Sequence, residues 1–103
     1  MIGEAERQGV AVHRVGPAAT KAELLTQFAR ALEFPGWVGR NWDALSDALR
    51  DLSWLPEGAH VVVWTGASKI DETAYEIALE VLQHATAMAA ETPRPLTVLL
   101  TAD

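Results

Sequence analysis

The sequence FPGWVGRNWDALSDAL, residues 34–49, combines an irregular loop with the start of an amphipathic helix. Pro35 disfavours helical backbone for the residue before it. A glycine on either side of Trp37 leaves the backbone free to turn there. The side-chain oxygen of Asn41 suits the free N–H groups of a first helical turn, which makes Asn41 the predicted N-cap. We therefore expect a loop that exposes Trp37, at least in part, and leads directly into a helix.

The helix after Asn41 has one apolar and one acidic face. At helical spacing, the apolar face holds Trp42, Leu45, Ala48, Leu49 and Leu52. The pattern predicts that Leu45 and Leu49 belong to the core. Trp54, Leu55 and Pro56 are expected to end this helix.

The acidic face carries Asp43, Asp47 and Asp51, one every four residues. Like charges at this spacing destabilise an isolated helix by roughly 0.2–0.5 kcal/mol per pair. The helix dipole favours Asp43 in the first turn but does not reach Asp47. Two interpretations follow: a solvated face on which Arg50 partly compensates Asp47, or a negative binding surface beside an exposed Trp37.

The remaining patterns predict three strands and two more helices. The strands are expected at residues 9–15, 60–65 and 96–101, and the second of them is continuously apolar, as in a central strand or one buried on both faces. A capping box of Thr20 and Glu23 opens a helix over residues 21–33. Asp71 caps a long helix after a short helical turn at residues 67–70.

These elements give the order β-α-α-β-α-β in one domain, residues 1–103. Each connection is long enough for parallel pairing, and crossovers of one hand place all helices on the same side. The expected fold is therefore α/β, with two layers and a three-stranded parallel sheet covered by helices on one face. In the last helix the apolar stripe is Tyr75, Ala78, Leu79, Leu82, Ala85 and either Met88 or Ala89. Tyr75 and Met88 are interpreted as core residues, and His13 in the first strand as a structural histidine.

Composition narrows the function classes. The chain has no cysteine, and half of its residues are hydrophobic, as in ordinary soluble domains. Its first seven residues lack a basic region followed by an apolar run, so no secretory leader is expected. No apolar stretch approaches the ~20 residues of a membrane helix. We expect a cytoplasmic protein.

The charge is −6, and residues 71–103 alone hold six acids and one base. This pattern excludes the basic surface typical of nucleic-acid binding and favours a basic protein partner. No phosphate-binding glycine loop, histidine pair or nucleophile motif is present. Asp43 and Asp47 are the only candidates for a metal-dependent enzyme, and we expect no metal, no cofactor and no catalysis.

Residues 32–49 resemble the central loop and second helix of the barstar family, intracellular inhibitors of the ribonuclease barnase. The family pattern is a proline, an aromatic residue and a glycine, then Asn-x-Asp-Ala-Leu-x-Asp. It is intact here at Pro35, Trp37, Gly39, Asn41, Asp43, Ala44, Leu45 and Asp47. The predicted order of elements extends the resemblance over nearly the whole chain.

The resemblance implies an antitoxin or immunity protein that blocks the active site of a small guanyl-specific ribonuclease. The acidic helix would enter the cleft where the RNA phosphates lie, with Asp47 in a phosphate subsite and Asp43 beside a second basic residue. The residues expected to bind the partner are Trp37, Val38, Gly39, Arg40, Asn41, Asp43, Ser46, Asp47 and His84. The implied partner is a basic small ribonuclease, barnase-like or related, and the free protein is expected to be a monomer that binds neither nucleic acid nor membrane.

Three positions depart from the family's namesake. Arg40 replaces an acid, Ser46 replaces a large aromatic residue, and His84 or Gln83 stands where the last helix carries an interface acid. Glu80, one turn earlier, is able to substitute for that acid. The alternatives are a barstar-fold module that binds another basic protein or toxin nuclease, and a metal-dependent enzyme using Asp43 and Asp47.

Overall fold

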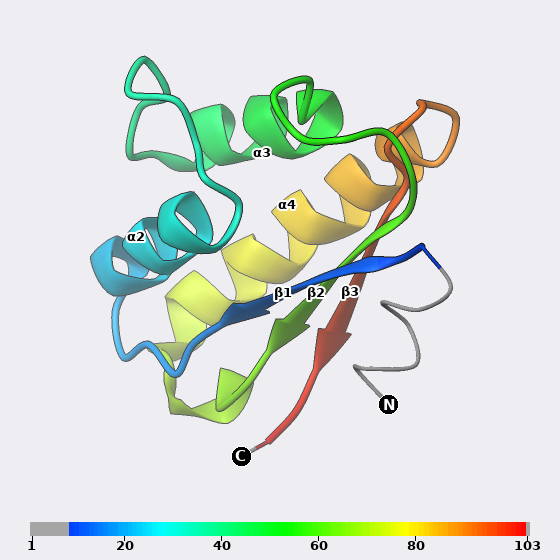
Figure 1. Ribbon diagram of the computed structural model, residues 1–103. Helices are drawn as coiled ribbons and strands as arrows, with labels where there is room; N and C mark the ends of the chain where they lie inside the picture. Colours follow the sequence, from blue (N-terminus) through cyan, green and yellow to red (C-terminus); the bar gives the residue numbers. More distant parts are fainter. Residues whose placement is uncertain (1–8, 103) are drawn as a thin grey trace.

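A computed structural model describes residues 9–102 of the chain (Figure 1). The elements, in order, are β1 (Ala11–Val15), α2 (Lys21–Ala31), α3 (Trp42–Asp51), β2 (His60–Trp64), the 3-10 turn η1 (Ala67–Lys69), α4 (Glu72–Ala89) and β3 (Leu96–Leu100). This order confirms the predicted β-α-α-β-α-β arrangement. Residues 1–7, for which no leader is predicted, lie outside the described part.

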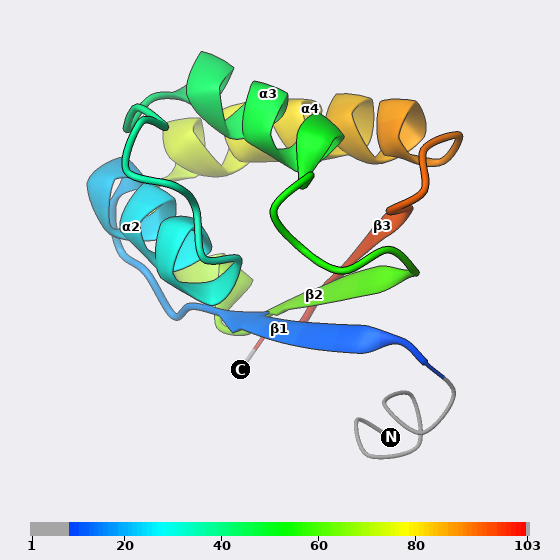
Figure 2. The same ribbon diagram turned by 45° about the horizontal axis from the view of Figure 1, so that its top comes forward.

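The three strands form one parallel sheet in the order β1-β2-β3. All three helices lie on the same side of this sheet, as Figure 2 shows. Helix α2 packs on β1, α4 packs on β3, and α3 packs mainly on α4. The predicted α/β fold is therefore confirmed, and α3 is the helix farthest from the sheet.

Strand β2 is central but is not buried on both faces. His60, Val62 and Trp64 are buried, while Val61 and Val63 between them are only partly covered. Because side chains alternate along a strand, the buried set faces the helices. The continuous apolar run thus reflects a central strand with one open face.

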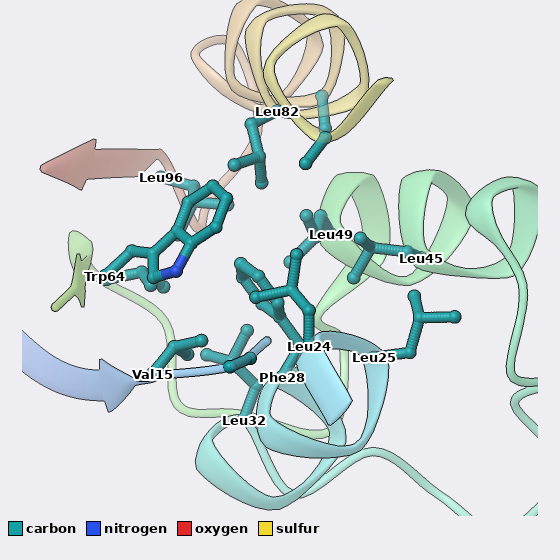
Figure 3. Close-up of a cluster of buried hydrophobic side chains, with 14 of the residues drawn as sticks. Val15, Leu24, Leu25, Phe28, Leu32, Leu45, Leu49, Trp64, Leu82 and Leu96 are labelled. Atoms are coloured by element: carbon teal, nitrogen blue, oxygen red, sulfur yellow. The ribbon is translucent and has the colours of Figure 1, made fainter. Parts of the chain in front are cut away.

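A large hydrophobic cluster joins the helices to the sheet. Its fully buried members include Phe28, Leu45, Leu49 and Trp64 (Figure 3). Leu45 is 1% exposed and Leu49 is 0% exposed, so the predicted orientation of α3 is confirmed. The acidic face of α3 consequently points to solvent.

Helix α2 ends two residues earlier than predicted. Glu33 has left-handed backbone with φ of 54°. The N–H of Phe34 donates to the Ala29 carbonyl at 2.9 Å, and that of Glu33 donates to the Arg30 carbonyl at 3.3 Å. This is the Schellman pattern, which normally has glycine at the left-handed position. Because Glu33 stands there instead, no glycine marks the early end of α2 in the sequence.

Helix α3 also stops early, at Asp51 rather than at Trp54. The next residue, Leu52, has left-handed backbone with φ of 49° and a fully buried side chain.

In α4 the apolar stripe ends on Ala89, which is fully buried, whereas Met88 is 51% exposed. The prediction that Met88 is a core residue is therefore wrong. The buried face of α4 runs through Ala78, Leu82, Ala85 and Ala89, and Met88 lies about 100° around the helix from Ala89. Among residues 9–102, no helix has the length and apolarity needed to cross a membrane.

Candidate protein-binding site

Helix α3 has a well-defined start beside the loop that carries Trp37. The Oδ1 atom of Asn41 accepts a hydrogen bond from the Ala44 N–H at 2.7 Å, which confirms the predicted N-cap. Within the loop, the Val38 N–H donates to the Pro35 carbonyl at 3.0 Å and closes a turn. Trp37 lies at the tip of this turn and is 75% exposed, as predicted. The loop lies beside the beginning of α3 in Figure 1.

Trp54 connects this loop to the end of α2 through one hydrogen bond and two ring contacts. Its Nε1–H donates to the Leu32 carbonyl at 2.8 Å, which satisfies an open carbonyl at the end of α2. Its ring makes edge contacts with Phe34 and Trp37, at centroid distances of 5.8 and 6.2 Å. From the sequence, Trp54 was expected only to end a helix, and no local pattern indicates its contacts with Leu32, Phe34 and Trp37.

A hollow of about 390 Å³ lies between the loop and α3. Its walls are Trp37, Val38, Gly39, Ala44, Asp47, Ala48 and Asp51. Four of these were predicted as binding residues: Trp37, Val38, Gly39 and Asp47. The Val38 side chain itself is buried, 7% exposed, so it forms the inner wall. Two carboxylates and one exposed indole thus share a single concave surface with an apolar base.

The other predicted binding residues lie around this hollow rather than in it. Arg40 and Asp43 are exposed beside the start of α3, and the side chain of Asn41 caps the helix. Ser46 is partly buried. His84 is exposed on α4, away from the hollow's lining. Ala44, Ala48 and Asp51 are lining residues that were not predicted as binding residues, although Asp51 belongs to the acidic row.

The acidic row is partly compensated within α3. Arg50 forms an ion pair with Asp47 through Nη2, and its Nε–H donates to the Ser46 carbonyl at 3.3 Å. Asp51 accepts a hydrogen bond from the Ser53 hydroxyl at 3.1 Å. The predicted compensation by Arg50 is confirmed, yet the Asp47 side chain remains 71% exposed. Asp47 is therefore both oriented by Arg50 and accessible to a partner.

The carboxylates of the acidic row are also the candidate ligands of a metal site. Within residues 9–102, no three side chains of His, Cys, Asp or Glu gather where they could hold one ion. The acidic row faces solvent along α3, and two of its members, Asp47 and Asp51, line the hollow.

A family model confirms the resemblance seen in residues 32–49. The model of Barstar (barnase inhibitor) matches residues 10–101, which is nearly the entire described chain. The chain belongs to the barstar family. A search of the curated proteins finds no match. The barstar-family match spans all of the strands and helices described above, including the loop and α3. Members of this family are inhibitors rather than enzymes, which supports a binding protein.

Proposed function

We propose that this barstar-family protein inhibits a small, basic, guanyl-specific ribonuclease by placing α3 and its adjoining loop in the enzyme's active site. It would act in the cytoplasm of the cell that makes the ribonuclease, as an immunity protein or antitoxin. One observation carries the proposal: Trp37 and Asp47 are exposed on the same hollow, at the capped start of a rigid helix.

The chemistry of such an active site matches this surface. A ribonuclease cleft holds phosphates with arginine, lysine and histidine side chains. Carboxylates on a rigid helix replace the phosphates by charge-assisted hydrogen bonds, which are stronger than neutral ones. Asp47 would take the central position and Asp43 would meet a second cation, while Trp37 would pack on the enzyme's surface.

Long-range charge favours the same partner. The chain carries −6 overall, and the segment from residue 71 onward contributes −5 of it. Opposite net charges accelerate association and make it sensitive to salt. Arg40 interrupts the acidic surface beside the start of α3, which favours an enzyme whose basic cleft also bears an acidic group opposite this arginine.

The direct test is a titration of ribonuclease activity with this protein. Purified guanyl-specific ribonucleases are mixed with increasing amounts of it, and RNA cleavage is followed. A cognate enzyme is expected to lose its activity at one inhibitor per enzyme. Tight binding of a basic protein that is not a nuclease, without inhibition of any guanyl-specific ribonuclease, would instead establish the alternative of a barstar-fold binding module.

Replacing Trp37 by alanine is expected to weaken partner binding by at least about tenfold, since tryptophans in the centre of interfaces commonly contribute more than 1–2 kcal/mol. Folding stability should change by no more than about 0.5 kcal/mol, because an exposed side chain loses little on truncation. Trp54→Phe is the matched control: it removes the hydrogen bond to Leu32 and should lower stability by about 1 kcal/mol. A large loss of stability in Trp37→Ala, measured by urea unfolding, would contradict the proposed role.

Replacing Arg50 by glutamine is expected to speed association with the ribonuclease several-fold at low salt. The change releases Asp47 from its ion pair and makes the surface more negative, which strengthens attraction to a basic partner. Arg30→Gln removes the same charge from exposed α2 and serves as the control. Stopped-flow association rates at low and high salt should converge as screening increases. Slower association in Arg50→Gln would mean that Arg50 itself contacts an acidic group of the enzyme.

A further inference from the structure

Two histidine rings meet on the helix-covered face of the sheet. Nε2 of His13 on β1 lies 3.0 Å from Nδ1 of His60 on β2. The ring planes are inclined by 25°, and the centroids are 5.2 Å apart. The centroid distance exceeds the N···N distance by about one ring diameter, so the rings lie end to end. This is the geometry of an N–H···N hydrogen bond and not of a face-to-face stack.

The outer nitrogen of each ring points to a backbone carbonyl. Nδ1 of His13 lies 3.2 Å from the Ala31 oxygen, and Nε2 of His60 lies 2.9 Å from the Pro56 oxygen. A carbonyl oxygen only accepts, so each outer nitrogen must carry a hydrogen. His60 is 2% exposed, and solvent therefore offers its nitrogens no alternative partner.

Counting hydrogens identifies the state that satisfies this chain of contacts. Three contacts require three N–H groups, but two neutral imidazoles supply only two. With both rings neutral, two bare nitrogens would face each other at 3.0 Å, or one carbonyl would lose its donor. With both rings charged, two N–H groups would collide. One added proton makes all three hydrogen bonds.

We propose that His13 and His60 form a buried proton-binding site that holds one positive charge, shared between the two rings. The charge lies next to the last turn of α2, where a cation is favoured by the helix dipole. It fixes the Ala31 carbonyl, while Trp54 fixes the neighbouring Leu32 carbonyl. The protonated pair thus stabilises the end of α2 by a hydrogen bond, and the loop that carries Trp37 begins directly after this end.

The surrounding groups limit the pair to a single proton. Burial is the largest influence on the pKa of His13 and lowers it; the hydrogen bond to the Ala31 carbonyl raises it, the charge of His60 lowers it, and Glu33 beyond α2 raises it. At the other end of the pair, Glu57 follows Pro56 in the chain. Arg94, before β3, donates to the Leu55 carbonyl at 2.7 Å. Burial opposes any proton on His13, and a charge on His60 opposes it further. The proposed single proton therefore depends on the three contacts, which one added hydrogen satisfies and a second would disrupt.

A site that holds one proton makes stability depend on pH in two directions. Unfolded histidines take up protons near pH 6.5. The proposed shared proton is held where unfolded histidines are still largely neutral, so the proposal requires the free energy of unfolding to rise as the pH falls from about 8. Below about pH 6.5 the unfolded chain binds two protons against one, so the free energy falls again, towards the lowered pKa of His13. The contribution of the pair is therefore largest near pH 6.5.

Nitrogen NMR of the imidazole rings tests the proposal on the unaltered protein. At about pH 6.5, we expect both outer nitrogens to be protonated and the two inner nitrogens to share one proton, with intermediate chemical shifts. His84, exposed on α4, provides a reference in the same spectra. Two neutral rings with a bare inner nitrogen on each at this pH would overturn the proposal.

The His60→Gln variant provides an independent test. A glutamine side chain carries two N–H groups, so it can serve His13 and Pro56 without an added proton. Urea unfolding midpoints are measured between pH 8 and 5. The wild type should be most stable near pH 6.5, whereas His60→Gln should gain no stability between pH 8 and 6.5. A wild-type unfolding midpoint that only decreases as the pH is lowered from 8 to 5 would show a neutral pair. If the variant does not fold, the NMR measurement on the wild type still decides the question.

Discussion

Asp47→Ala is expected to weaken ribonuclease binding by at least about 30-fold while leaving the fold intact. The Asp47 side chain is 71% exposed in the free protein and forms only an ion pair with Arg50. Its removal should therefore change the free energy of unfolding by no more than about 0.5 kcal/mol. In the proposed complex the carboxylate is buried against cations, and its loss leaves them without a partner.

The cost of such an unpaired charge is typically 2–5 kcal/mol or more, and tenfold in affinity corresponds to about 1.4 kcal/mol. The range rests on buried interfacial charge pairs, those of the barstar–barnase complex among them, and is carried over to Asp47. Most of the loss should appear as faster dissociation, because the pair acts after encounter.

Glu57→Ala is the matched control for this experiment. It removes one exposed carboxylate from the loop before β2, outside the hollow, and so changes net charge by the same amount. This control should change the rate of association with the ribonuclease slightly and leave the rate of dissociation nearly unchanged. If Asp47→Ala unfolds the protein, or binds a cognate ribonuclease as tightly as the wild type, then Asp47 is not the phosphate mimic.

Leu49→Ala is expected to lower the free energy of unfolding by about 2–5 kcal/mol. Leu49 is 0% exposed and belongs to the cluster that joins α3 to α2, α4 and the sheet (Figure 3). Truncation removes buried apolar surface and leaves a cavity that the neighbouring helices fill only partly. Leu45, 1% exposed, should behave in the same way.

Leu99→Ala makes the same chemical change at a position that is 52% exposed on β3. Its effect on urea unfolding should be within about 1 kcal/mol, because little burial is lost. Both variants remove the same side-chain atoms, so a difference between their free energies of unfolding reports the effect of burial and packing. Losses of only a few tenths of a kcal/mol at Leu45 and Leu49 would contradict the orientation of α3.

Local patterns in the sequence were sufficient for the start of α3 and for the orientation of its faces. The Asn41 cap, the buried leucines and the exposed acidic row all depend on residues within one or two turns. Helical periodicity and capping act over such short separations, so they can be recognised without knowledge of the fold. The exposure of Trp37 followed in the same way from its proline and glycines.

The features that tertiary structure decided join residues far apart in the chain. Trp54 contacts Trp37 only because the loop after α3 returns to the end of α2, and no periodic pattern in the sequence predicts that contact. His13 and His60 are 47 residues apart and meet only because β1 and β2 pair in parallel in one register. Whether Met88 or Ala89 enters the core is likewise decided by which face α4 turns towards α3 and β3. Local hydrogen bonds and periodicity thus determined the elements of this protein, whereas packing between distant segments determined what each side chain meets.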